Sequence, residues 1–220
     1  PVLRPSDRVE IEPTVVYRSH LGAWDPGVHA LARAGDTWRL TIDARRATFT
    51  NDAWIYSDLI NTFNALFVGA DTRNYYRADR IEATVGRIDR TVTLELETFA
   101  GVMTERAWSV GSRDTLGSRP WTVIGRGDAD NFPRPNPAIE RGRITSAVVG
   151  GSARWQYGDV LTNTVARFEV PWQAPESARF AQITVDASVR FPTFGLQRFR
   201  SDIHLVATPG DTAPPQRFVY

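Results

Sequence analysis

The feature that most constrains the fold of this chain is a two-residue alternation of apolar and polar side chains. Ile183, Val185 and Ala187 alternate with Thr184 and Asp186. The same spacing recurs in residues 92–97 and 199–207. Successive side chains of a β-strand point to opposite faces, so this pattern places one face of each strand on a core and the other toward water. The alternation predicts an all-β protein.

About eight or nine segments qualify as strands, and most of the 14 prolines and 16 glycines lie between them. The strand candidates are residues 9–17, 36–43, 75–88, 91–99, 121–126, 143–149, 164–171, 180–191 and 198–208. A chain of 220 residues with this pattern commonly folds as one unit. We therefore expect a single domain over residues 1–207, followed by an extended C-terminal arm over residues 208–220.

Residues 57–67 break the alternation and predict a short helix. Ser57 is suited to cap its start, Gly69 is suited to end it, and its apolar residues recur at helical spacing: Leu59, Phe63, Leu66 and Phe67. A buried strand is the alternative interpretation of this segment.

The composition excludes several kinds of chemistry. The chain has no cysteine, which rules out disulfides, zinc–thiolate sites and thiol nucleophiles. All 26 basic residues are arginine. A GC-rich coding sequence, selection against ubiquitin attachment or against flexible amines at buried contacts, and the suitability of arginine for protein interfaces all remain open explanations. The net charge of +1 predicts only weak contact with nucleic acid. No 18-residue apolar segment occurs, so we expect no membrane insertion.

No catalytic motif emerges from the histidines and serines. His20 and His29 fall in a segment containing glycine and proline that we interpret as a loop, and His204 alternates with apolar residues. The run Gly150-Gly151-Ser152 lacks the closing glycine of a nucleophile turn and is interpreted as an ordinary turn. We therefore expect no enzyme activity and no cofactor.

Acidic residues offer two further candidates. Glu95 and Glu97 share one strand face and could begin a glycosidase site, although alternating acids on an exposed strand are far more common. Asp128 and Asp130 could bind calcium through oxygen atoms, without the other acidic positions of a known calcium loop.

Two segments outside the strands favour contacts with other molecules. The long loop over residues 125–143 contains Arg126, Gly127 and Asp128, the tripeptide of integrin ligands, although a chance match is easy in an arginine-rich chain and a turn-forming Gly-Asp is far more common. The chain finishes on Phe218, Val219 and Tyr220, and we expect these residues to contact a neighbouring subunit. Seven tryptophans are expected to lie mostly in the core, with the rest at an interface.

One stretch resembles a known family. Residues 58–67 (DLINTFNALF), followed by residues 75–85 (YYRADRIEATV), are similar to the jelly-roll coat proteins of small icosahedral viruses, in which a short helix precedes a strand with this Tyr-Arg-x-x-Arg pattern. The resemblance covers about 40 residues. Many such proteins carry a basic N-terminal arm; this chain has only Arg4 and Arg8 there.

The resemblance implies a two-sheet antiparallel jelly-roll sandwich with a short helix after the early strands. It also implies a structural capsid subunit that assembles with copies of itself or related coat subunits in a virion, with a cell-surface receptor as a further partner. The alternatives are a carbohydrate-binding β-sandwich module, a phage tail or decoration protein, and a lipocalin-like protein enclosing a small ligand.

Overall fold

The computed structural model describes residues 2–18, 23–50, 75–109, 121–122, 125–126, 139–210 and 213–217. These residues are almost entirely strand, as the alternation predicts, and the all-β prediction is confirmed. The helix predicted over residues 57–67 lies outside the described residues.

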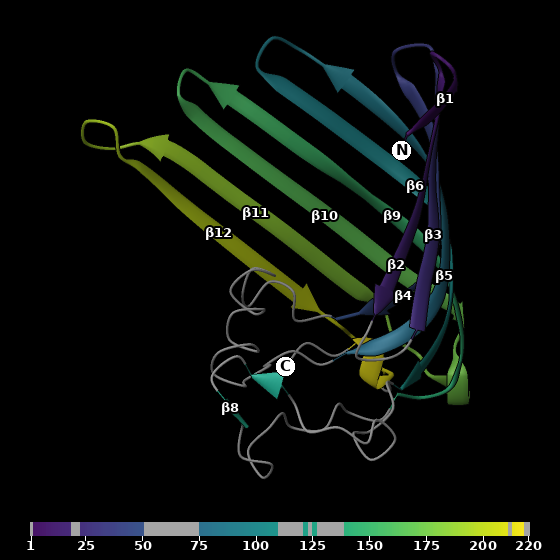
Figure 1. Cartoon of the computed structure of the whole chain (residues 1–220). Helices are drawn as coiled ribbons and strands as arrows, with labels where there is room; N and C mark the ends of the chain where they lie inside the picture. The colour runs from purple at the N-terminus through teal and green to yellow at the C-terminus, as the bar shows by residue number, and fades with distance from the viewer. Residues whose placement is uncertain are drawn as a thin grey trace.

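Ten strands form one antiparallel sheet (Figure 1). In sheet order these are β1 (Leu3–Ser6), β2 (Val9–Arg18), β3 (Ala23–Ala34), β4 (Trp38–Phe49), β5 (Tyr76–Arg90), β6 (Leu94–Ser109), β9 (Gly142–Tyr157), β10 (Val160–Gln173), β11 (Gln182–Pro192) and β12 (Arg198–Ala207). A separate two-stranded pair consists of β7 (Trp121–Thr122) and β8 (Gly125–Arg126). Two short 3₁₀ segments complete the described elements, η4 (Pro175–Ser177) and η5 (Pro215–Arg217).

The two-sheet jelly-roll sandwich is not confirmed. A jelly roll is built from Greek keys, which place strands that are distant in sequence side by side. Here each strand of the large sheet lies beside its neighbour in the chain, apart from the step from β6 to β9. The ten strands of the large sheet therefore form a single meander.

Several strands were missed or shortened in the prediction from the sequence, among them β3, β6 and β9. β3 contains Pro26 and Gly27, so the segment resembles a loop, yet His29 lies within this strand. β6 continues ten residues past residue 99. The run Gly150-Gly151-Ser152, interpreted as a turn, lies in the middle of β9. A Cβ on Gly150 would come within 2.6 Å of the Phe99 ring, so close packing between strands explains this glycine.

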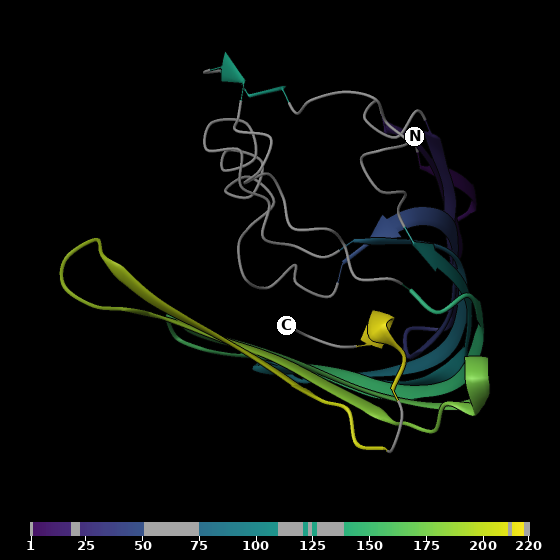
Figure 2. The ribbon, with the colours of Figure 1, turned by 90° about the horizontal axis from the view of Figure 1, so that it is seen from below.

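The sheet is strongly curved, with a concave and a convex side (Figure 2). The buried side chains of the sheet lie on the concave side. Examples are Met103 on β6 and Ile144 and Val148 on β9, which the strand register places on the same face. A small apolar cluster at one end combines Tyr76, Ala78, Ala107 and Ile139 with partly buried Phe49.

The described part of the C-terminal segment also lies on the concave side. η5 follows the isolated bridge between Phe180 and Gly210, and its residues Gln216 and Arg217 are buried (Figure 2). The Gln182 side-chain amide donates a hydrogen bond to the Arg217 carbonyl oxygen at 2.9 Å. The domain boundary at residue 207 stays a prediction, but residues 213–217 pack against the sheet.

Candidate functional site

Arg217 is the centre of a buried cluster of charges on the concave face. Its guanidinium group donates to Glu105 at 2.9 Å and to Glu169 at 3.1 Å. Glu105 lies on β6 and Glu169 on β10, so one side chain from η5 joins two strands that β9 separates. The pKa of Arg217 is raised despite its burial, because both carboxylates stabilise the charged guanidinium.

Arg80 extends this cluster along β5. Its guanidinium binds the same Glu105 carboxylate and donates to the Tyr76 hydroxyl at 2.9 Å. On the other flank, Ser146 donates to Glu169 at 2.8 Å. Isolated charges are very costly to bury, so these pairings are what permit a fully buried Glu105.

A cavity of about 430 Å³ opens over this cluster. Beside it, Arg167 on β10 binds Glu82 on β5 with two parallel hydrogen bonds of 2.7 and 2.9 Å. The cavity lining holds four arginines and three carboxylates. Glu105 binds two of those arginines and brings the number of carboxylates to four. The charges balance, so the arrangement suits water and polar solutes better than an ion of one sign.

The convex face has the opposite character. Within the large sheet, the strand register aligns a row of apolar residues across nine strands. The row consists of Val9, Ala32, Leu40, Val85, Ala100, Val149, Phe168, Ile183 and Ala207. Most of its larger members are exposed, for example Val85 at 51% and Val149 at 45%. Contiguous apolar surfaces of this kind mark an interaction surface.

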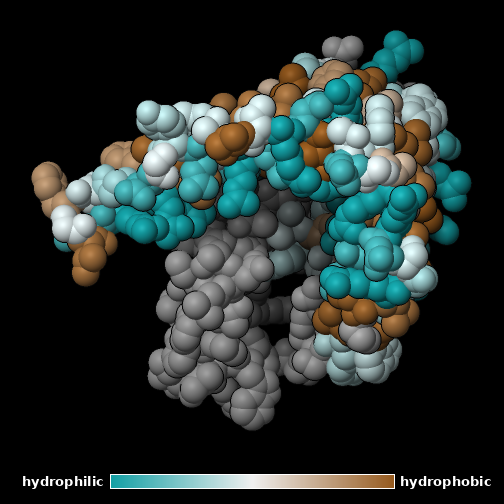
Figure 3. Space-filling model, turned by 90° about the horizontal axis from the view of Figure 1, so that it is seen from above, coloured by the Kyte–Doolittle hydropathy of each residue, from teal (hydrophilic) through white to brown (hydrophobic). Residues whose placement is uncertain are grey.

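A neighbouring row widens this surface. It runs through Ala30, Ile42, Ala83, Val102, Ala147 and Val170, again without a polar residue. We call the convex surface formed by these two rows the apolar band. In the space-filling view, hydrophobic patches occur along the outer margin of the curved sheet, with polar residues between them (Figure 3).

Aromatic side chains lie on the convex face on both sides of the apolar band. Toward the tight turns, Trp38 begins β4, and Trp155 stacks on Tyr157 with 6.0 Å between ring centroids. At the opposite end, the rings of Tyr17 and Trp24 lie 4.8 Å apart. Most tryptophans were expected in the core, but Trp24 is 61% and Trp38 49% exposed. This expectation was wrong for them because the sheet buries its concave face.

The candidate residues from the sequence are only partly placed. Gly127, Asp128 and Asp130 lie outside the described residues, and Arg126 is described only as backbone in β8. The proposed calcium and receptor sites therefore stay predictions. Phe218, Val219 and Tyr220 also lie outside the described residues, so their subunit contact stays a prediction too.

Glu95, Glu97 and His204 lie on the concave face in ion pairs, whereas His20 lies outside the described residues. Glu95 binds Arg90 at 2.6 Å, and Glu97 lies 3.5 Å from Arg39. His204 Nδ1 lies 2.5 Å from an Asp186 carboxylate oxygen. Within the described ranges, no group of three or more His, Asp or Glu side chains is placed to hold a metal ion.

Neither the Arg217 cluster nor the apolar band was predicted from the sequence. The band was present in the alternation, but the pattern does not say which face is buried. The polar residues that alternate with the apolar ones are the only signal for the second face. They include charged residues near the centres of β5, β6 and β10, which indicates that this face carries charge.

In the part of the chain that the structure describes, no helical segment has the length and hydropathy of a bilayer-spanning helix. Comparison with protein-family models, with curated proteins and with solved structures finds no match to this chain.

Proposed function

We propose that this chain is a membrane-embedded β-sheet protein, with its convex face in contact with lipid hydrocarbon and its concave face lining a polar interior. The observation that carries the proposal is the apolar band, which continues through nine neighbouring strands. In a bilayer, outward-facing side chains are apolar and inward-facing ones are polar, the reverse of a water-soluble sheet.

Two further observations support this proposal. A tilted strand crosses the hydrocarbon with about 9 to 11 residues, and β2 to β12 of the large sheet contain 10 to 16. Tryptophan and tyrosine concentrate at the two bilayer interfaces, where one side of the ring is apolar and the other is wet. The exposed Trp38, Trp155 and Tyr157 at one end, and Tyr17 and Trp24 at the other, fit that distribution.

The expectation of no membrane insertion came from a search for long apolar segments. Such a search detects helices, whereas a strand that faces lipid on one side alternates and never forms an apolar run. The expectation therefore does not bear on strands. Backbone groups in hydrocarbon must be hydrogen-bonded. The proposal consequently requires pairing partners for the outer edges of β1 and β12, which have none among the described strands.

The concave face suggests what such a protein does in the membrane. Its balanced lining of arginines and carboxylates accommodates water and polar solutes, and η5 occupies part of that space. We propose a polar path or binding cavity whose width is limited by residues 213–217.

Fluorescence quenching by brominated lipids tests the membrane assignment. The purified chain is folded in detergent micelles and transferred to phosphatidylcholine vesicles whose acyl chains carry bromine. We expect tryptophan emission to fall, because Trp24 and Trp38 lie at the margins of the apolar band. The chain should also float with the vesicles through a density gradient. A chain that stays in the dense fraction, with unquenched emission, contradicts the proposal.

The second candidate is the shell subunit implied by the coat-protein resemblance, located in a virion. The observation that favours it is again the exposed apolar band, which copies of the chain would bury between them. This candidate predicts closed particles in electron micrographs of the protein without lipid or detergent. The membrane proposal predicts irregular aggregates under those conditions.

A further inference from the structure

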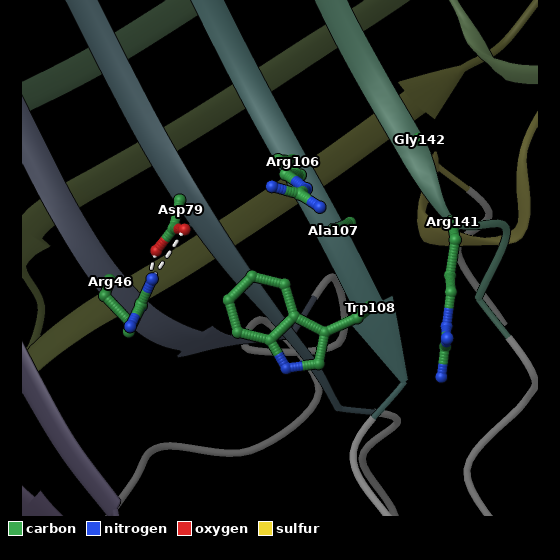
Figure 4. Close-up of a pocket in the computed structure, with 7 residues that line it drawn as sticks. All are labelled: Arg46, Asp79, Arg106, Ala107, Trp108, Arg141 and Gly142. Carbon is green, nitrogen blue, oxygen red and sulfur yellow. Dashed lines mark hydrogen bonds and ion pairs between the residues drawn. The ribbon is translucent and has the colours of Figure 1, made fainter.

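A cavity of about 540 Å³ lies at the end of the sheet opposite the tight turns (Figure 4). Its lining includes Arg46, Asp79, Arg106 and Trp108 from strands β4 to β6, and Arg141 just before β9. The Arg46 guanidinium binds Asp79 through two hydrogen bonds of 2.6 and 2.8 Å. The same guanidinium lies 5.6 Å from the centre of the Trp108 ring. Asp79 is thus already paired.

The strand register places further arginines beside this pair. Arg46 is opposite Asp79, Asp79 is opposite Arg106, and Arg106 is opposite Arg143, so four charged residues form one row across β4, β5, β6 and β9. All four have the parity of the convex face.

Among the described residues, this row carries more positive than negative charge. Asp79 attracts Arg106 electrostatically, but no described carboxylate forms an ion pair with Arg106, Arg141 or Arg143. Like charges directly opposite one another on a sheet are destabilising. Arg106 and Arg143 are such a pair. No described carboxylate lies opposite Arg143 in β6 or β10, so an anion placed between Arg106 and Arg143 would relieve their repulsion.

The position of the row indicates where that anion comes from. Arg106 lies six residues beyond Ala100 of the apolar band, about 20 Å along the strand and, at a tilt of about 45°, about 14 Å along the bilayer normal. Half of a bilayer's hydrocarbon thickness is about 15 Å. With Ala100 near the bilayer centre, the arginines therefore reach the level of the lipid headgroups, and Trp108 lies two residues further along β6.

We propose that Arg106, Arg141 and Arg143 form a binding site for the phosphate group of an anionic lipid. The guanidinium fork matches phosphate oxygens in two parallel hydrogen bonds, and the cavity leaves room for a headgroup. The lipid's acyl chains would lie along the apolar band. This inference rests on the membrane assignment and adds to it a preference for one class of lipid.

Vesicle binding with two lipid compositions tests the inference. The full chain is titrated with vesicles of phosphatidylcholine alone and of phosphatidylcholine with phosphatidylglycerol. The test variant is Arg106→Gln/Arg143→Gln. The matched control is Arg190→Gln/Arg198→Gln, which removes the same charge from exposed positions on the concave face.

We expect the wild-type chain and the control to bind the anionic vesicles more tightly than the neutral ones. The test variant should lose about fivefold in affinity for each arginine removed, or about 25-fold in all, and only for the anionic vesicles. Its binding to neutral vesicles should be unchanged.

Three results would overturn the site. The test variant and the control could lose preference equally, which would indicate net charge instead of a site. The wild-type chain could bind both vesicles equally, which would leave the membrane assignment intact. Inorganic phosphate could bind and saturate Arg106 and Arg143 without any preference for phosphatidylglycerol, which would assign the site to free phosphate. Failure to bind neutral vesicles would instead contradict the membrane assignment itself.

Discussion

Arg217 and Glu105 are separated by 112 positions in the sequence, yet Nη1 of the arginine lies 2.9 Å from Oε1 of the glutamate. Both side chains are buried, with 4% and 0% of their side-chain surface exposed. This contact fixes the end of the described chain to the centre of the sheet, and it shows that the concave face is organised by charge.

Replacement of Arg217 by methionine should strongly destabilise the protein. Among the described residues, Glu105 would keep Arg80 as its partner and Glu169 would keep Ser146. Breaking a buried ion pair from one side typically costs about 3 to 5 kcal/mol. Urea unfolding in detergent micelles, followed by tryptophan fluorescence, measures the change in the free energy of unfolding.

The matched control for this replacement is Arg200→Met. Arg200 pairs with Asp202 on the exposed part of β12, so its loss should change stability little. Equal effects of the two replacements would show that the Arg217 cluster does not stabilise the sheet.

The pair of Arg167 and Glu82 should show measurable coupling. These side chains join β10 to β5 over the two strands between them, and both are about one quarter exposed. Because water screens them in part, we expect a coupling energy of about 1 kcal/mol from a double-mutant cycle of Arg167→Gln and Glu82→Gln. Strictly additive effects would contradict the bidentate contact.

Gly101 should tolerate no side chain. A Cβ there would collide with the Ala83 carbonyl oxygen on β5 and lie 2.7 Å from the Thr84 Cα. Gly101→Ala should therefore destabilise the sheet by about 1 to 3 kcal/mol in the same unfolding measurement. Gly86→Ala is the control, because its Cβ would meet its nearest neighbour at 3.3 Å. A larger loss of stability from Gly86→Ala than from Gly101→Ala would contradict the close contact of β5 and β6 at Gly101.

Val102→Arg should weaken insertion into phosphatidylcholine vesicles. Val102 is an exposed member of the apolar band, and an arginine that faces lipid near the bilayer centre costs about 2 to 4 kcal/mol. The control is Asn163→Arg, on the concave face of β10, which should insert normally. Flotation in a density gradient gives the bound fraction of each. If Asn163→Arg reduces the bound fraction more than Val102→Arg does, then the concave face and not the convex face contacts lipid.

Much of the strand pattern could be predicted from the sequence. The strand predicted over residues 198–208 agrees with β12 to within one residue, and β11 lies inside the predicted 180–191 apart from Pro192. These segments have short-range alternation without interruption. β3 and the second half of β6 could not be predicted so easily, because Pro26, Gly27 and Gly101 carry turn signals that pairing with neighbouring strands overrides.

The candidate sites were harder to predict, because each is made from residues of several strands. Glu105, Glu169 and Arg217 come together only through the register of β6, β9 and β10 and the position of η5. The row of Arg46, Asp79, Arg106 and Arg143 likewise exists only in the paired sheet. A single sequence carries no signal for contacts of this kind.

By itself the sequence determined that this is an all-β protein, because a period of two sorts side chains onto opposite faces whatever the partners of a strand are. The tertiary structure decided that hairpins join into one curved sheet and that the charged face is the concave one. The physical reason is that alternation is symmetric between the two faces. Only the pairing of the strands and the direction of their curvature determine which face is enclosed and which is left for another molecule to cover.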